Sequence, residues 1–185
     1  NSHEFICNHD LNGSILAVNK VATKILGYTE QALCKQNLKD LVIAEDQESL
    51  QAYLTLIADK KFAKGMLRFA DKEGKTIYLD YNNTLRDQGF GSGIVSWIAH
   101  DVTAQVESDI ELRNKSYLLA EAQRIAKIGS WELNMQTGEV QFSSEMYKIF
   151  GINPGEAEMT FPSLWQRTCK DGREELGRRL KSFMV

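Results

Sequence analysis

Two histidines and an aspartate are the residues of this chain best suited to bind a metal or a haem. His9 stands near the amino terminus, whereas His100 and Asp101 are neighbours much later in the sequence. A haem requires an axial ligand that points into a pocket, and a metal site requires several ligands that converge. These three residues form no recognisable metal-binding cluster, so we expect no metal site.

A glycine-rich segment and an amino-terminal histidine resemble pieces of nucleotide-dependent enzymes. A phosphate-binding loop needs a preceding strand, a following helix and a lysine, but strand-like sequence without lysine follows Gly89–Gly93. We therefore interpret this segment as a hairpin loop. His3 precedes Glu4 and Phe5 as in a kinase phospho-acceptor box, but no proline follows and no ATP-lid glycines appear. The sequence thus indicates no catalytic site, and we expect this chain not to be an enzyme.

Composition narrows the class of protein. Of the 185 residues, 43% are apolar and 25% are charged, which is typical of a globular chain. The net charge of −3 provides no basic surface for nucleic acid, and no apolar run approaches the roughly 18 residues that cross a bilayer. Cys7, Cys34 and Cys169 follow no metal or disulfide spacing. We expect a cytoplasmic chain with no nucleic-acid partner and no membrane span.

The first hundred residues predict two strands, several short helices and then three more strands. The strand-like runs are 4–10, 14–19, 62–70, 76–85 and 94–102. Asn12 and Gly13 fit a two-residue type I′ turn, because both central positions of that turn need positive φ. Asp71–Gly74 joins the third run to the fourth. Successive hairpins predict an α+β fold with an antiparallel sheet and helices on one face.

The helices between the strands are indicated by capping residues and apolar stripes. Gly27 suits the left-handed residue that ends a helix, and Thr29 suits the N-cap of a short helix over 30–36. Asp46 is expected to cap a longer amphipathic helix. Its apolar stripe is Leu50, Tyr53, Leu54 and Ile57. Residues 104–128 predict a long, partly exposed helix with a mixed charge pattern.

The chain contains an internal repeat. Phe5–Asn19 and Trp131–Phe142 each consist of a short run, a glycine turn and another short run, and a helix ending in glycine follows each. The turn glycines, 13 and 138, are 125 positions apart, and the helix-end glycines, 27 and 151, are 124 apart. A period of this length indicates a repeated domain. The second copy covers about half the span of the first.

These features resemble the PAS family of sensor domains. In the first copy the resemblance is carried by the opening hairpin, the phrase Ile25–Leu33 and the closing triplet Asp101-Val-Thr103, which is similar to the Asp-Ile-Thr that ends the family's sheet. In the second copy, 122–133 and 142–151 are similar to a PAS subfamily common in bacterial sensor histidine kinases. The His-Pro that often precedes the family's long helix is absent from both copies.

The resemblance implies a fold and a division into three parts. The fold is a PAS-like five-stranded antiparallel sheet with helices on one face, followed by a linker helix and a partial second module. The expected parts are a first PAS domain over 1–103, a signalling linker helix over 104–128, and the amino-terminal half of a second PAS domain over 129–185.

The resemblance also bears on cofactors. In flavin-binding relatives a reactive Cys follows the Gly-Tyr helix, but Asn37 stands near that place and Cys34 falls three residues earlier. The flavin-contacting polar residue lies two before the closing Asp, where this chain has Ala99. Haem-binding relatives place a His on the central helices, and 21–60 contain none. We expect no haem, no covalent flavin and no tightly bound organic cofactor, although an unidentified small ligand stays open.

Strand alternation indicates which residues would line a small apolar cavity. Val95, Trp97 and Ala99 share one face of their strand, and Ile94, Ser96, Ile98 and His100 share the other. The candidate lining residues are Phe5, Leu54, Ile57, Leu67, Phe69, Tyr81, Trp97 and Ala99. A bulge would exchange the two faces and turn Trp97 outward into an interface. We favour the inward orientation.

The expected function is that of a signal-input and dimerisation module. Asp101 and Thr103 are expected to join the last strand to the 104–128 helix and to relay the state of a ligand or partner. A homodimer is expected through that helix and through the open second module, because uncovered apolar surface and open strand edges mark interfaces. The parent is expected to be a two-component sensor histidine kinase with a downstream kinase domain. Alternatives are a ligand-free protein–protein interaction domain and the input region of a cyclic-dinucleotide enzyme.

Overall fold

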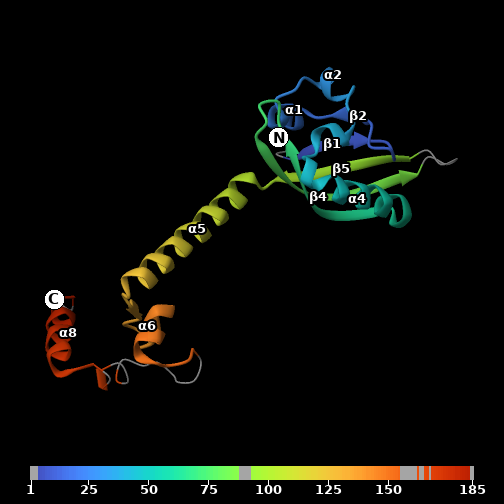
Figure 1. Cartoon of the computed structure of the whole chain (residues 1–185). Helices are drawn as coiled ribbons and strands as arrows, with labels where there is room; N and C mark the ends of the chain where they lie inside the picture. The colour runs from blue at the N-terminus through green and yellow to red at the C-terminus, as the bar shows by residue number, and fades with distance from the viewer. Residues whose placement is uncertain (1–3, 88–92, 155–161, 163–164, 167, 184–185) are drawn as a thin grey trace. The chain divides into compact units, whose positions relative to one another are not determined.

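The computed structural model describes residues 4–87, 93–154, 162, 165–166 and 168–183, and the chain divides into two compact units, Asn1–Ile110 and Glu111–Val185. The first unit contains one antiparallel sheet in the order β2-β1-β5-β4-β3 (Figure 1). Its strands are β1 (Phe5–His9), β2 (Ile15–Val18), β3 (Phe62–Ala70), β4 (Thr76–Asp87) and β5 (Gly93–Asp101). Each strand overlaps its predicted run, so the predicted five-stranded antiparallel sheet is confirmed.

The helices of the first unit cover one face of this sheet. They are α1 (Lys20–Leu26), α2 (Glu30–Leu33), α3 (Leu38–Leu41), the 3₁₀ turn η1 (Ala44–Asp46) and α4 (Gln47–Lys60). On β5, Val95, Trp97 and Ala99 are buried in one cluster with apolar residues of the helices, whereas Ile98 and His100 on the opposite face are exposed. The core therefore lies between the helices and one side of the sheet.

The turn between β1 and β2 differs from the predicted type I′ hairpin. Gly13 has φ of 83°, but Asn12 is not among the described non-glycine residues with positive φ. Instead the carboxylate of Asp10 accepts hydrogen bonds from the backbone N–H groups of Asn12 (2.9 Å) and Ser14 (2.8 Å). The Gly13 N–H donates to the Asp10 carbonyl at 3.0 Å. Because Asp10 satisfies these donors, the loop needs only one left-handed residue.

The predicted helix caps are confirmed at two positions. Gly27 is left-handed (φ 74°) and ends α1, and its N–H donates to the Thr23 carbonyl at 3.0 Å. The Thr29 hydroxyl accepts from the N–H of Ala32 at 3.2 Å and caps α2. That helix ends at Leu33, earlier than the predicted 36.

The predicted capping role of Asp46 is wrong. Its side chain makes no capping hydrogen bond to α4, because η1 leads into the helix and gives Asp46 φ −104° and ψ 8°. Its carboxylate instead accepts from the Arg68 N–H at 2.9 Å and from the Arg68 guanidinium. This charge-assisted hydrogen bonding lowers the pKa of Asp46. Asp46 therefore fastens the start of α4 to β3.

The long helix α5 extends over Thr103–Ala126, close to the predicted 104–128. None of the helices in the described part of the chain has the length and apolar composition that a bilayer crossing requires. The division into a domain over 1–103, a linker and a half domain over 129–185 stays a prediction.

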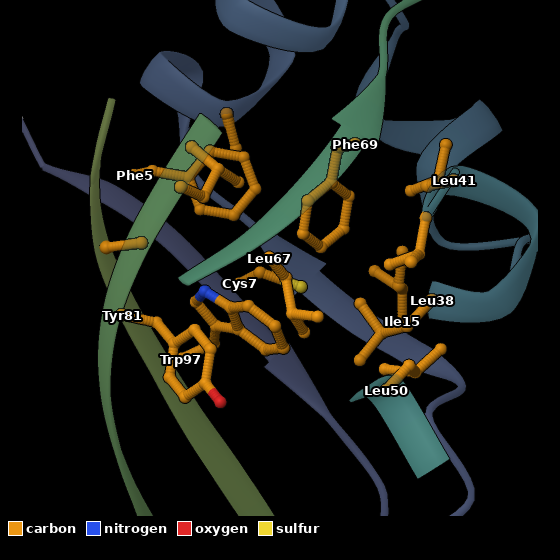
Figure 2. Packing of buried hydrophobic residues seen from close by; sticks show 14 of the residues in the cluster. Phe5, Cys7, Ile15, Leu38, Leu41, Leu50, Leu67, Phe69, Tyr81 and Trp97 are labelled. Atoms are coloured by element: carbon orange, nitrogen blue, oxygen red, sulfur yellow. The ribbon is translucent and has the colours of Figure 1, made fainter. Parts of the chain in front are cut away.

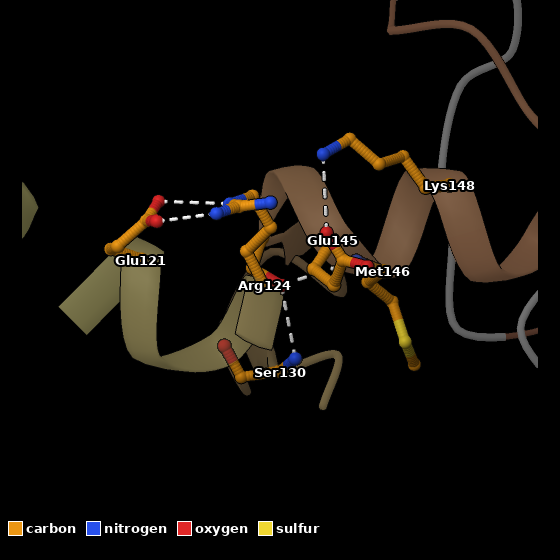
Figure 3. A network of polar contacts seen from close by, with 7 residues as sticks. Glu121, Arg124, Ser130, Glu145, Met146 and Lys148 are labelled. Atoms are coloured by element: carbon orange, nitrogen blue, oxygen red, sulfur yellow. Dashed lines mark hydrogen bonds and ion pairs between the residues drawn. The ribbon is translucent and has the colours of Figure 1, made fainter. Parts of the chain in front are cut away.

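After the end of α5, the second unit continues with a hairpin and a helix. Its described elements are β6 (Trp131–Leu133), β7 (Val140–Phe142), α6 (Ser144–Phe150) and α8 (Lys170–Phe183). Figure 3 shows ion pairs of neighbouring residues along its helices, Arg124 with Glu121 and Lys148 with Glu145. The Arg124 and Lys148 side chains are 58% and 62% exposed, so these pairs contribute little to stability. That this unit is half of a second PAS domain stays a prediction.

Candidate functional site

The residues predicted to line a cavity come together in the first unit, but they form a packed core. All except Leu54 are buried: Phe5, Ile57, Leu67, Phe69, Tyr81, Trp97 and Ala99. Leu54 is partly buried and packs against the cluster. Figure 2 shows how the labelled members of this cluster pack together across the strands. Ala99 pairs with Phe5 of β1 on one side and with Tyr81 of β4 on the other.

Trp97 lies at the centre of this core, so its predicted inward orientation is the one found. Its side chain is fully buried (0% exposed). Four aromatic rings surround the indole at centroid distances of 4.9 Å to Tyr53, 5.0 Å to Tyr81, and 5.7 Å to both His9 and Phe69. The Trp97 Nε1 is buried and has no hydrogen-bond partner among the described residues. The indole therefore occupies the interior that a ligand ring would need.

A chain of buried polar side chains runs beside Trp97. His9 and Asn83 are fully buried, and Tyr53 is 2% exposed. The Tyr53 oxygen lies 2.8 Å from His9 Nε2 and accepts from Asn83 Nδ2 at 3.0 Å. Asn83 Oδ1 accepts from the Ile98 N–H at 3.0 Å. These bonds join β1, α4, β4 and β5 inside the core.

The protonation states in this chain follow from its geometry. His9 Nδ1 lies 2.6 Å from the Asp10 carbonyl oxygen, which can only accept, so Nδ1 carries the proton. Nε2 is then an acceptor for the Tyr53 hydroxyl. Burial lowers the pKa of His9, although its bond to the Asp10 carbonyl and the Asp10 carboxylate oppose the shift. Burial likewise raises the pKa of Tyr53. Both groups are neutral at pH 7.

Sequence reasoning missed this polar chain. His9 was considered only as a metal ligand, Tyr53 only as part of an apolar stripe, and Asn83 not at all. A usable signal existed, because His9 follows Phe5 and Cys7 on one strand face and Asn83 follows Tyr81 in the same way. A polar residue that continues a buried row is expected to have a buried partner.

The candidate metal and thiol residues do not form a site. His9 faces the helices, whereas His100 is exposed on the opposite face of the sheet. In the part of the chain that the structure describes, no three His, Cys, Asp or Glu side chains gather as metal ligands would. Cys34 is half-buried, and its thiol donates to the Leu16 carbonyl at 3.6 Å. Burial raises the pKa of Cys7 to about 12, so its thiol is unreactive. His3 and most of the Gly89–Gly93 segment lie outside the described residues.

Asp101 and Thr103 form a hydrogen-bonded junction between β5 and α5. Asp101 Oδ1 accepts from the Thr103 N–H at 2.9 Å and from the Thr103 hydroxyl at 2.5 Å. The Thr103 hydroxyl oxygen accepts from the Tyr78 N–H at 3.0 Å, and the Val102 N–H donates to the Tyr78 carbonyl at 3.0 Å. The start of α5 is thereby attached to β4 as well as to β5.

Beyond this junction, α5 exposes apolar side chains. Each of the following is at least 45% exposed: Ile110, Leu112, Tyr117, Leu118, Leu119 and Ile125. These side chains leave apolar surface uncovered along α5.

Comparison with known proteins identifies the first unit. The family model of the PAS fold matches residues 1–102. A PAS domain of a protein from Colwellia psychrerythraea is 20% identical, with 56% of this chain and 89% of that chain covered and a TM-score of 0.50. A PAS domain from a two-component sensor histidine kinase is 18% identical, with 55% and 86% covered and a TM-score of 0.48.

A domain of a sensory box sensor histidine kinase/response regulator from Geobacter sulfurreducens is 20% identical, with 54% of this chain and 84% of that chain covered and a TM-score of 0.47. No curated protein sequence matches the chain. At 20% identity, the solved structure with a TM-score of 0.50 indicates fold alone. Because the family model of the PAS fold matches residues 1–102, more than half of the chain, the chain belongs to the PAS family.

Proposed function

We propose that this chain is the signal-input and dimerisation module of a bacterial signal-transduction protein, in particular a two-component sensor histidine kinase. The observation that carries the proposal is one continuous connection. Trp97 in the core and Asp101 at the junction lie on the same strand, and Thr103 begins α5. A change in the core is transmitted along β5 to the start of the helix.

The input would be a small ligand or a partner surface that distinguishes two arrangements of the sheet. A ligand shifts such an equilibrium only by its difference in affinity for the two states. The buried indole favours an input without a tightly bound organic cofactor, because a large ring would have to displace Trp97. The same observation favours a second candidate function, a ligand-free interaction domain with a permanently filled core.

The output would be a change in how two copies of α5 associate. The exposed apolar side chains of α5 provide the surface for a homodimer. Replacing both Leu118 and Ile125 with Glu should convert a dimer into a monomer in light scattering at micromolar concentration. The matched control is Ser116→Glu, which adds charge to the same exposed helix and should leave the dimer intact. A monomeric wild-type chain would contradict the proposed dimer.

Two further measurements test the proposed input and relay. Native mass spectrometry of untreated protein should detect no bound flavin, haem or nucleotide, and a stoichiometric small molecule would identify the ligand. Fusion of the whole chain to a histidine kinase catalytic core should give autophosphorylation that changes with Asp101→Ala but not with Asp80→Ala, an exposed Asp on β4. Equal rates in both variants and the wild type would refute a relay through this junction.

A further inference from the structure

The hydrogen bonds of the polar chain all run in one direction. The Ile98 N–H donates to Asn83, Asn83 donates to Tyr53, Tyr53 donates to His9, and His9 donates to the Asp10 carbonyl. The Tyr53 hydroxyl proton has an acceptor in this series only while His9 Nε2 is unprotonated. The chain therefore depends on a single protonation state of one residue.

The far end of this chain coincides with an interruption in the sheet. β4 and β5 pair from Leu79–Asp101 to Tyr81–Ala99, and pairing resumes in the same register at Thr84–Ser96. Between these pairs, the Ile98 N–H donates to the side chain of Asn83. The Asn83 side chain thus holds β5 to β4 next to Trp97, where the backbone ladder is open.

Protonation of His9 is incompatible with this arrangement. A proton on Nε2 would point at the Tyr53 oxygen, and the Tyr53 hydroxyl proton would then have no acceptor. The added charge would also lie at a position with no exposed surface, and unpaired buried charges and donors are costly.

Few groups near His9 offset such a charge. The titratable groups around it are Asp10 beside it on the β1–β2 turn, Cys7 on the same face of β1 and Tyr53 on α4, and Tyr81 on β4 contacts Tyr53. Asp10 is already bonded to two backbone N–H groups. The neighbouring strands present groups that do not titrate, Ile15 on β2 and Val95 and Trp97 on β5. Among the described residues, the Asp10 carboxylate is therefore the anionic group placed to stabilise an imidazolium.

We propose that His9, Tyr53 and Asn83 form a proton-sensitive tie, in which protonation of His9 releases β5 from β4 at Ile98. At neutral pH all the hydrogen bonds of this tie are formed, and they connect β1, α4, β4 and β5 within the core. As the pH falls below the ordinary His value of 6.5, the unfolded chain binds a proton that the folded chain excludes. The folded state with a closed tie consequently loses stability toward acid pH.

The first test is urea unfolding of the full chain between pH 7.5 and pH 5, followed by circular dichroism. The wild-type midpoint should fall as the pH is lowered, and His9→Gln should lose most of this dependence. The matched control is His100→Gln, which removes an exposed histidine of the same sheet and should keep the wild-type dependence. An equal pH dependence in wild type and His9→Gln would overturn the proposal.

A second measurement on the wild type covers the case in which His9→Gln does not fold. Long-range proton–nitrogen NMR of the histidine rings, assigned with His100→Gln, should show His9 with its proton on Nδ1 and a titration midpoint below 6.5. A proton on Nε2, or a midpoint at or above 6.5, would overturn the proposal.

The coupling to β5 is tested by amide hydrogen exchange. Tyr53→Phe keeps the ring but removes the hydroxyl between His9 and Asn83. Exchange at the Ile98 amide should accelerate about fivefold or more, with Phe69 in the β3–β4 ladder as the internal control. Unchanged protection at Ile98 would show that the tie does not reach β5. These readouts concern the chain alone, so they do not depend on the proposed relay through α5.

Discussion

Each unit contains a hairpin that leads into a short helix, and the two hairpins share the same local structure. In the first, the Asn19 N–H donates to the Ile6 carbonyl and the Asn19 side chain accepts from the Ile6 N–H. In the second, Ser143 makes the same two bonds with Ser130. The strand pairs correspond as well, since Cys7 faces Val18 and Trp131 faces Phe142. Each second-unit residue lies 124 positions after its counterpart, so the predicted internal repeat extends to individual hydrogen bonds.

The units differ in what covers this hairpin. In the first, β1 also pairs with β5, and the hairpin joins a large core. In the second, β6 and β7 form a two-stranded sheet, and of their residues only Val140 is buried. The counterpart of His9 is Leu133, which is half-buried. Helix caps and turn residues are therefore sufficient to specify the hairpin and the first helix. Burial of the hairpin and formation of the polar chain also require the three long strands, β3, β4 and β5.

The largest expected difference between the units concerns tryptophan. Trp97→Ala removes the ring at the centre of the first core and should lower the free energy of unfolding by about 3–5 kcal/mol. Trp131→Ala is the matched change, and a clearly smaller loss is expected because Trp131 is only half-buried. Urea unfolding measured by circular dichroism compares the two. Equal losses would contradict the distinction between a covered and an uncovered hairpin.

The next largest effect is expected from the polar chain of the first unit. Tyr53→Phe leaves His9 Nε2 and Asn83 Nδ2 without their partner, which should cost about 1–3 kcal/mol at pH 7.5. Tyr117→Phe, at a 69% exposed position of α5, is the control and should be near neutral. The same urea measurement applies. A neutral Tyr53→Phe would mean that the buried hydroxyl contributes no net stability.

The helix caps should show the smallest difference between the units. Asn19 accepts from the Ala22 N–H at 2.9 Å and also bonds to Ile6 and Glu4. Ser143 accepts from Met146 and Ser130. Each replacement by Ala should cost about 1 kcal/mol of local or global stability, the larger loss falling at Asn19. Amide exchange at Ala22 and Met146 measures both, and protection unchanged at either amide would argue against that cap.

Most of the secondary structure could be predicted from sequence because its signals are local. Gly27, Thr29 and the alternation around Trp97 each depend on neighbouring residues or on a fixed strand period. Two local predictions failed where a distant or side-chain partner competed for the same group. Asp46 bonds to Arg68, 22 positions away, and Asp10 replaces the second left-handed residue expected in the Asn12-Gly13 turn.

Only the apolar part of the candidate site could be predicted, because its polar contacts join residues that are far apart in the sequence. Strand alternation and one helix stripe identify the apolar residues of the core. The polar chain depends on His9 meeting Tyr53 across 44 positions and on Tyr53 meeting Asn83 across 30. No local pattern specifies those meetings, because they result from α4 packing onto β1 and β4. The interruption in the β4–β5 ladder likewise follows from a side chain replacing a backbone partner.

The last prediction concerns the hydrogen-bonded junction of Asp101 and Thr103, which connects the core of the first unit to α5. Asp101→Ala removes the acceptor for the Thr103 N–H and hydroxyl and should cost about 1 kcal/mol in urea unfolding. Amide exchange at Thr103–Val106 should rise more than exchange at Val95, since the change loosens the start of α5 while leaving Trp97 covered. Asp80→Ala is the control. If Asp101→Ala prevents folding, the junction holds the sheet together, and its role as a relay loses its support.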